Sequence, residues 1–327
     1  MIENTETGAL ENFNFEHLQK HVPELQNFTF RIDTYQFDPP MDSSDMDPDA
    51  WRKLVRIISD NYERYTGFVI LHGTDTMAYT ASALSFMLEG LNKPVILTGA
   101  QQPISNEITD AKKNLRDSVV CAIDPGSRGV MVVFGGHVIA GTRAKKNKTI
   151  SYDAFASVNF PELALVQGDR LVRYIPSPWP TGPVEFSRTL DSRVFLLKLT
   201  PGMSPALIPE IFRLYDCVIV ESFGVGGIPS YDGNDFLSVL EEGIQGGKTV
   251  VLTTQVQNEG SNLSVYDVGF HLKNDLHLLE AYDMTTEAVV AKLMWILGQT
   301  RDPAEIRRLF CTPVSYDLLY LKREDKA

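Results

Sequence analysis

The stretch from residue 67 to residue 98, GFVILHGTDTMAYTASALSFMLEGLNKPVILT, decides the fold. It opens with Gly67 to Leu71, a short continuous apolar run that is typical of a strand buried on both faces. A helix-length segment rich in Ala, Met and Leu follows from Thr76 to Leu91, and a second strand follows from Pro94 to Thr98. Strand, helix and strand in this order predict a βαβ unit and a parallel sheet.

The alternation continues on both sides of that stretch. A helix is expected over 48–61, with Asp47 as its N-cap, and another over 110–122, followed by a strand over 129–134. We therefore expect a larger N-terminal doubly wound α/β domain with a parallel sheet, covering residues 1–174.

A proline-rich segment separates this part from a second one. Residues 175–183 read IPSPWPTGP, which can be neither a helix nor a central strand, so 175–192 is interpreted as a stiff linker. A smaller C-terminal α/β domain is expected over 193–327. Its predicted strands are 194–199, 217–220 and 249–252, and its predicted helices are 205–214, 232–245, 287–297 and 304–310.

Composition excludes several classes of function. The 327 residues include 30 basic and 42 acidic ones, a net charge of −12, which argues against nucleic acid and against anionic membranes as partners. No apolar run reaches the roughly 18 to 20 residues that span a bilayer, and the polar N-terminus is unlike a signal peptide. A cytoplasmic protein is expected. No Cys/His spacing predicts a metal site, and the three cysteines, in apolar settings, are expected to be reduced.

Polar loops follow several of the predicted strands. Residues 72–77 follow one strand, 99–103 follow the next, and 141–146 follow a predicted hairpin, while 42–45 precede a helix. Ligands of open parallel sheets bind in the crevice beyond the carboxyl ends of the strands. These loops are therefore the expected place of the chemistry.

Thr74 and Asp75 form the sharpest pair in these loops. A threonine hydroxyl is a weak nucleophile that needs a base or a cation, and a desolvated Lys146 could supply either, with Asp75 holding the lysine or an amino group of a substrate. The residues alone leave other roles open. Thr74, Asp75 or Thr76 could simply cap the following helix, and Lys146 could be a solvated surface lysine.

The serines ahead of the first helix are equally open to two interpretations. Ser43, Ser44 and Asp45 could form an ordinary turn that leads into the helix, or they could bind a ligand.

The order of these segments resembles the bacterial L-asparaginase family, specifically its cytosolic type I branch. The resemblance is carried by MDSSDM at 41–46, by GFVILHGTDTMAYTASALSFML at 67–88, by KPVILTGA at 93–100 and by YDAFASVN at 152–159. It runs along almost the whole chain.

The resemblance implies hydrolysis of L-asparagine to L-aspartate and ammonia, without metal or cofactor. It assigns catalysis to Thr74, Asp75 and Lys146: Thr74 would position or activate the attacking water or hydroxyl, Asp75 would bind the α-ammonium group, and Lys146 would form a network with both.

The remaining assignments concern substrate binding. Ser43 would contact the α-carboxylate, Ser44 would be the next contact, and Ala100 would offer its carbonyl to the substrate amide. Glu287 would contribute to the ammonium site across a subunit interface, in a homodimer or homotetramer whose active site is completed by the neighbouring chain.

Three departures from the family pattern carry expectations of their own. The family begins with a strand that ends in Thr-Gly-Gly-Thr-Ile and carries the main nucleophile. That segment lies ahead of the family position that corresponds to Met1. We therefore expect a start site upstream, and we expect the chain without that segment to have poor activity and stability. Ala9 stands near the place of a family tyrosine, and Gly227 replaces a usual asparagine.

Two other functions stay open at this point. One is a non-catalytic amino-acid-binding relative that keeps Ser43 and Asp75 without the main nucleophile. The other is an amidotransferase subunit, for which an extra N-terminal domain and a basic surface would be expected; this acidic chain shows neither.

Overall fold

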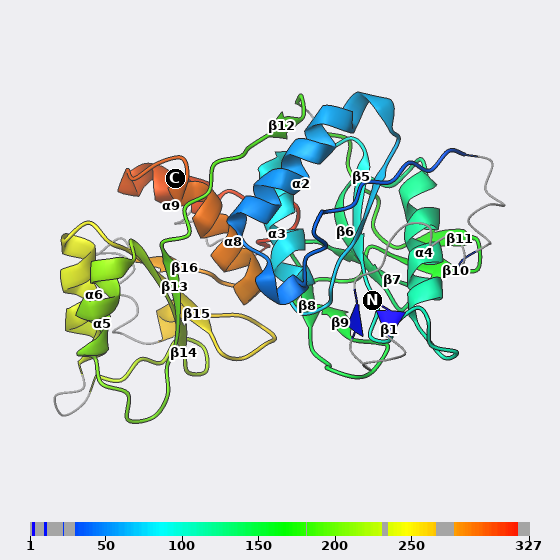
Figure 1. The fold of residues 1–327 in the computed structure, drawn as a ribbon. Helices are drawn as coiled ribbons and strands as arrows, with labels where there is room; N and C mark the ends of the chain where they lie inside the picture. The colour runs from blue at the N-terminus through cyan, green and yellow to red at the C-terminus, as the bar shows by residue number, and fades with distance from the viewer. Residues whose placement is uncertain are drawn as a thin grey trace.

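Two sheets and the helices between and around them make up the molecule (Figure 1). The structure, a computed structural model, describes residues 2–3, 10–11, 22, 30–180, 182–230, 235–265 and 278–319. A short antiparallel pair, β1 (Ile2–Glu3) and β2 (Leu10–Glu11), lies near the N-terminus.

The larger sheet has six strands in the order β11-β10-β7-β6-β5-β3. Its parallel half is β3 (Phe68–Leu71), β5 (Pro94–Thr98) and β6 (Gly129–Phe134), with Phe68 opposite Val95 and Ile96 opposite Met131. This half confirms the predicted parallel strands.

The other half of the larger sheet is antiparallel. Its strands are β7 (His137–Ala140), β10 (Ala164–Gln167) and β11 (Arg170–Arg173). Hairpins join β6 to β7 and β10 to β11, and β10 also pairs antiparallel with β7. The chain reverses between β6 and β7 through Gly135 and Gly136, whose φ angles of 62° and 94° favour glycine. The sheet is therefore mixed, because a hairpin can continue a sheet without a crossover helix.

Helices cover the parallel strands on both faces, which confirms the doubly wound arrangement. On one face Val95 and Val132 pack with α3 (Met77–Met87), and on the other Ile96 and Met131 pack with α4 (Ala111–Ile123). The alternation follows from the two-residue period of a strand. The capped helix α2 (Pro48–Asn61) packs outside α3.

Helix α3 ends four residues before its predicted end at Leu91. The chain leaves it at Met87 and forms β4 (Leu88–Glu89), which pairs with β12 (Glu185–Phe186) of the proline-rich segment. Because this pairing gives the backbone of residues 88 and 89 other hydrogen-bond partners, the helix does not continue to Leu91.

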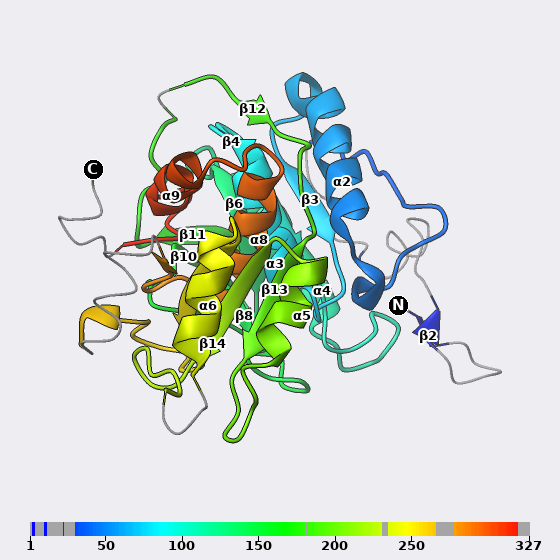
Figure 2. The ribbon, with the colours of Figure 1, turned by 90° about the vertical axis from the view of Figure 1, so that its left-hand side faces the viewer.

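The smaller sheet is wholly parallel among the described residues, in the order β13-β14-β15-β16. Its strands are β13 (Val194–Lys198), β14 (Cys217–Ser222), β15 (Thr249–Thr254) and β16 (Leu279–Glu280). Figure 2 shows α5 (Leu207–Leu214) and α6 (Phe236–Gln245) in front of this sheet. The smaller parallel-sheet unit of the prediction is thereby confirmed.

The second face of the smaller sheet packs on α8 (Thr286–Leu297), which also packs on α3. Phe86 of α3 stacks on Trp295 of α8 with ring centroids 6.1 Å apart. A helix from the C-terminal part therefore shares one hydrophobic core with the N-terminal part. The last helix, α9 (Pro303–Cys311), lies against α8.

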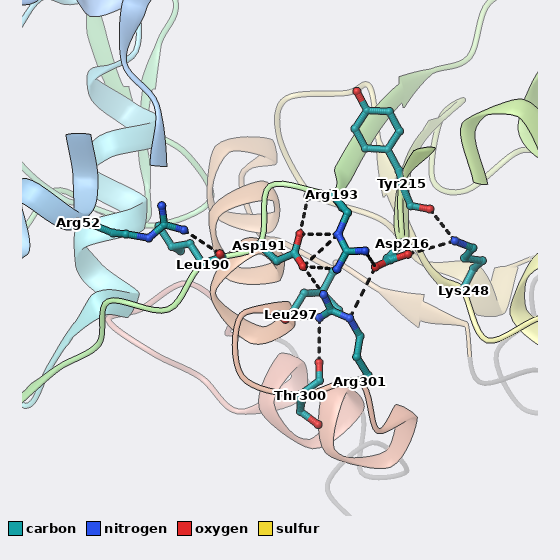
Figure 3. A network of polar contacts seen from close by, with 10 residues as sticks. All are labelled: Arg52, Leu190, Asp191, Arg193, Tyr215, Asp216, Lys248, Leu297, Thr300 and Arg301. Carbon is teal, nitrogen blue, oxygen red and sulfur yellow. Dashed lines mark hydrogen bonds and ion pairs between the residues drawn. The ribbon is translucent and has the colours of Figure 1, made fainter. Parts of the chain in front are cut away.

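The segment predicted as a linker is fastened to both parts. Arg52 of α2 donates hydrogen bonds to the carbonyls of Arg188 and Leu190, at 3.0 and 2.9 Å. Asp191 forms ion pairs with Arg193 and Arg301, and both arginines also reach Asp216 (Figure 3). Arg193 lowers the pKa of Asp191 to about 2.

The three cysteines, which are expected to be reduced, are free. No helix of the described residues could cross a membrane.

Candidate active site

A pocket of about 220 Å³ lies at the carboxyl ends of β3 and β5, where the sequence predicted the chemistry. Five of the seven predicted site residues contribute to its wall. Its lining consists of Met41, Asp42, Ser43, Gly73, Thr74, Asp75, Ala100, Gln101, Lys146 and Thr149.

The loop after β3 is held against the turn that precedes α2. The Thr76 hydroxyl donates to the carbonyl of Ser43 at 2.6 Å, and the His72 amide donates to the carbonyl of Thr98 at 2.8 Å. Gly73 faces the Ser43 side chain so closely that a Cβ there would collide with its hydroxyl. Glycine at 73 therefore allows the two loops to meet.

Thr74, Asp75 and Lys146 meet at this edge. The Lys146 ammonium group donates to Thr74 Oγ1 at 2.7 Å and to Asp75 Oδ1 at 2.6 Å. The Lys146 side chain is 16% exposed and that of Asp75 is 68% exposed, so the lysine is directed inward while the carboxylate borders the solvent. The structure thus favours the network over a solvated lysine; the neighbouring exposed Lys148 pairs with Asp153 instead.

The capping role considered for this loop is absent. Thr76 is the N-cap residue of α3 but makes no side-chain capping bond, and the Thr74 hydroxyl is engaged by Lys146 and Gln101. Thr74 is 9% exposed at the pocket wall, where the Lys146 ammonium group contacts its hydroxyl.

The serine turn divides into a ligand-facing and a structural residue. Ser43, Ser44 and Asp45 form the 3-10 helix η2 (Ser43–Asp45). Ser44 donates its amide and its hydroxyl to Asp42 at 2.8 and 2.6 Å, which lowers the pKa of Asp42. Ser43 is buried and lines the pocket, whereas Ser44 does not line it, so the geometry of Ser44 is that of a turn residue.

The loop that presents Ala100 is organised by a buried carboxylate that sequence reasoning missed. Asp110 accepts the amides of Gln101 at 2.9 Å and of Gln102 at 3.0 Å, and Asn114 donates to the carbonyl of Gly99 at 2.9 Å. Nothing in a single sequence marks Asp110, because it reads as the start of a helix. Its contacts appear only when the loop folds back over it.

Gln101 is a second residue that the sequence did not single out. Its Oε1 accepts the Thr74 hydroxyl at 3.1 Å, and it lines the pocket beside Ala100. The feature of the sequence that could have pointed to Gln101 is its position directly after Ala100, in a loop that follows a strand.

Glu287 does not line the pocket of its own chain. It lies on α8 and accepts from the Lys145 ammonium at 3.2 and 3.3 Å. Lys145 and Lys146 are neighbours in β8 (Ala144–Lys146), which pairs with β9 (Phe155–Ser157), so their side chains leave opposite faces. The predicted role of Glu287 in the ammonium site stays a prediction that requires a second chain.

The two other positions singled out by the family pattern lie elsewhere. Gly227 forms a β-bridge with Phe223 in the C-terminal part, and it does not line the pocket. Ala9 lies outside the described residues.

His72 makes structural hydrogen bonds and does not line the pocket. Its Nδ1 lies 2.6 Å from the carbonyl of Gly73, and its Nε2 lies 2.9 Å from the hydroxyl of Thr80, which also accepts from Trp51. Burial lowers the pKa of His72 and favours the neutral ring. A neutral ring protonated on Nδ1 satisfies both contacts.

The part of the chain that the structure describes contains no group of three or more His, Cys, Asp or Glu side chains that could hold a metal ion. The pocket instead offers hydroxyls, one ammonium group and carboxylates. Such a set suits a small zwitterion and an activated hydroxyl.

Comparison with known families accounts for nearly the whole chain. The model described as "Asparaginase, N-terminal" matches residues 1–178, and the one described as "Glutaminase/Asparaginase C-terminal domain" matches residues 193–310. The chain belongs to the asparaginase family. This confirms the resemblance seen in the sequence.

Individual members of the asparaginase family resemble it in sequence and in structure. An L-asparaginase of Thermococcus kodakarensis is 41% identical over 270 residues, 82% of this chain and 81% of that protein. L-asparaginase 1 of Escherichia coli K12 is 37% identical over 291 residues, 88% and 84% of the two chains. The solved structure of the thermostable L-asparaginase from T. kodakarensis superposes with a TM-score of 0.92 at 35% identity, covering 97% of this chain and 95% of that one.

Proposed function

We propose that this chain hydrolyses the side-chain amide of L-asparagine, giving L-aspartate and ammonia. The observation that carries the proposal is the contact of the Lys146 ammonium with both Thr74 and Asp75 at the wall of the pocket. The names of the relatives, L-asparaginase in each case described above, support the same substrate.

The proposed chemistry centres on the Thr74 hydroxyl. A nearby cation stabilises the oxygen as its proton passes to the departing amide nitrogen, and the activated oxygen attacks the amide carbonyl or activates a water to do so. The C–N bond breaks and the nitrogen leaves as ammonia; if Thr74 itself attacks, a water then hydrolyses the ester, which releases aspartate and restores the hydroxyl. Lys146 is the cation within reach, at 2.7 Å. Asp75 holds Lys146 in that position through its 2.6 Å contact.

The remaining roles concern the zwitterionic end of the substrate. We assign the α-carboxylate to Ser43, with Ser44 behind it in the same turn, and the α-ammonium group to the solvent-bordering carboxylate of Asp75. The carbonyl of Ala100 would accept from the substrate amide. Fixed charges and donors of this kind replace the water that an amino acid loses on binding.

The assembly is part of the proposal. We expect a homodimer or homotetramer in which Glu287 of a second chain approaches the ammonium site. Within one chain Glu287 pairs with Lys145, so it would have to exchange that partner. Sedimentation equilibrium would test the assembly. We further propose a cytoplasmic enzyme that needs no metal or cofactor and binds neither nucleic acid nor membrane.

Ammonia release from L-asparagine and L-glutamine tests the function directly. Lys146→Met should lower kcat by roughly 10³-fold or more, because the activating cation is removed. Lys148→Met is the matched control, since Lys148 is exposed and pairs only with Asp153 among the ion pairs of the described residues. Its kcat should stay within about threefold of the wild type, and EDTA should leave the wild-type rate unchanged.

Binding of asparagine without ammonia release would contradict the proposal and favour the non-catalytic amino-acid-binding alternative. Calorimetry with L-asparagine separates the two, because it reports binding whether or not turnover follows.

A further inference from the structure

Gln101 places a carboxamide against the hydroxyl that the proposed reaction uses. Its Oε1 accepts the Thr74 hydroxyl at 3.1 Å, and its Nε2 donates to the carbonyl of Lys148 at 3.4 Å. The same side chain lines the pocket. A carboxamide is also the functional group on which the proposed reaction acts.

The contact uses the single proton of the Thr74 hydroxyl. A hydroxyl has one donor and two acceptor positions. Lys146 occupies an acceptor position from 2.7 Å, and Gln101 takes the donor. While Gln101 stays in place, Thr74 has no proton to offer to the carbonyl of an incoming amide.

The main chain of Gln101 is fixed, whereas its side chain is held weakly. The amide nitrogen donates to both Asp110 oxygens, at 3.1 and 2.9 Å, so the loop keeps its shape. Among the described residues the side chain has two contacts, at 3.1 Å to Thr74 and at 3.4 Å to the carbonyl of Lys148. Rotation about its own bonds can therefore release Thr74 without moving Ala100 or the loop.

We propose that the Gln101 carboxamide occupies the subsite of the substrate carboxamide at Thr74 and has to leave it before the substrate binds. Gln101 thereby sets the KM of the enzyme. The inference rests on the proposed function, because it assigns Thr74 to the reacting end of the substrate.

Gln101→Met removes the carboxamide while keeping a side chain of similar length. We expect the KM for L-asparagine to fall about 2- to 10-fold, the equivalent of one net hydrogen bond, with kcat within about twofold. Gln101→Glu should raise KM at least about tenfold, because a carboxylate accepts the Thr74 hydroxyl more strongly than a carboxamide does and so competes more strongly for the site. Gln102→Met is the matched control, since the Gln102 side chain accepts from Asn106 at 3.1 Å and does not line the pocket; its KM should not change.

A second background isolates the Thr74 contact. In Thr74→Val the hydroxyl is gone, and the Kd of L-asparagine can be measured by calorimetry without turnover. Adding Gln101→Met there should change Kd by less than about twofold. If Gln101→Met lowered the Kd of L-asparagine by the same factor in the wild type and in Thr74→Val, Gln101 would act only by filling space. That result would overturn the inference.

Two other results would also overturn it. A KM that rises in Gln101→Met would show that Gln101 holds the substrate, and an unchanged KM would show that the contact does not compete. If the wild type released no ammonia, the proposed function would fail instead. The Kd of L-asparagine in wild type and Gln101→Met would then still test the competition.

Discussion

At the scale of single residues, the face of a strand from which a side chain projects decides its partners more than its residue type does. Lys145 and Lys146 are adjacent and alike, yet one pairs with Glu287 and the other contacts Thr74. The alternation of side chains along β8 separates them. Lysine spacing in the sequence could not show which of them faces the pocket, and the family resemblance was what selected Lys146.

Asp75→Asn should weaken binding of the substrate ammonium group. Loss of a charge-assisted hydrogen bond predicts a fall in kcat/KM of about 10- to 100-fold, at the lower end of the usual range because the Asp75 side chain is 68% exposed. Succinamate, which is asparagine without its α-amino group, should lose less than asparagine does, because for that substrate only the hold of Asp75 on Lys146 is weakened. Equal losses on both substrates would refute the ammonium role.

His72 should make stability depend on pH. Burial lowers its pKa in the folded state, so below about pH 6.5 the unfolded chain takes up a proton that the folded chain does not. The contribution of His72 to the free energy of unfolding is therefore fully present above about pH 6.5. It decreases as the pH falls, by at most about 1.4 kcal/mol per pH unit. Urea unfolding between pH 7.5 and 5.5 should show a steeper loss in wild type than in His72→Gln; parallel curves would contradict this.

At the scale of elements, the sequence predicted those that obey a local rule. Asp47 and Pro48 begin α2 as expected, and the Asp47 carboxylate accepts the amide of Ala50 at 2.8 Å. The β4–β12 pair was not predicted, because its partners are separated by almost a hundred residues and neither is strand-like alone. Local propensity carries no information on such pairings.

The loop that carries Ala100 and Gln101 depends on Asp110 rather than on its own sequence. Asp110→Ala would leave the amides of Gln101 and Gln102 without their acceptor, at a cost of about 2 to 4 kcal/mol in the free energy of unfolding. It should also raise KM, because the Ala100 carbonyl is no longer held. Asp110→Asn keeps one acceptor oxygen, so its stability and its KM should lie between those of the wild type and those of Asp110→Ala. Urea unfolding and ammonia release would measure both effects, and an unaltered KM in a destabilised Asp110→Ala would exclude the positioning role.

At the scale of the whole molecule, the larger and the smaller sheet are joined by the packing of α8 on α3 and by polar contacts, some buried and some exposed. The sequence predicted two α/β units and a linker between them, because each unit repeats strand and helix locally. It could not predict that α8 packs on α3, since both helices are apolar on most sides and either could have been buried within its own unit. We therefore expect a single unfolding transition for the two parts.

The polar contacts that fasten the C-terminal part to the N-terminal part and to the linker differ most in burial. Arg143, wholly buried, donates to the Asp283 carboxylate at 2.6 Å and to the Asp283 carbonyl at 2.6 Å, joining the loop before β8 to the loop before α8. Arg301, with its side chain 44% exposed, pairs with Asp191 and Asp216 at the rim (Figure 3). No water reaches the buried pair, so the loss of one partner leaves the other poorly solvated. At the exposed pair, water can solvate the group that remains.

The same substitution at both arginines tests this difference. Arg143→Met removes the guanidinium group from the buried Asp283 carboxylate and should lower the free energy of unfolding by about 3 to 5 kcal/mol, whereas Arg301→Met should cost less than about 1 kcal/mol. Adding Asp283→Asn to Arg143→Met makes that buried side chain neutral and should recover part of the loss. Urea denaturation at pH 7 measures all three variants. Similar losses for Arg143→Met and Arg301→Met would mean that burial does not make the Arg143–Asp283 pair contribute more to stability than the exposed pair does.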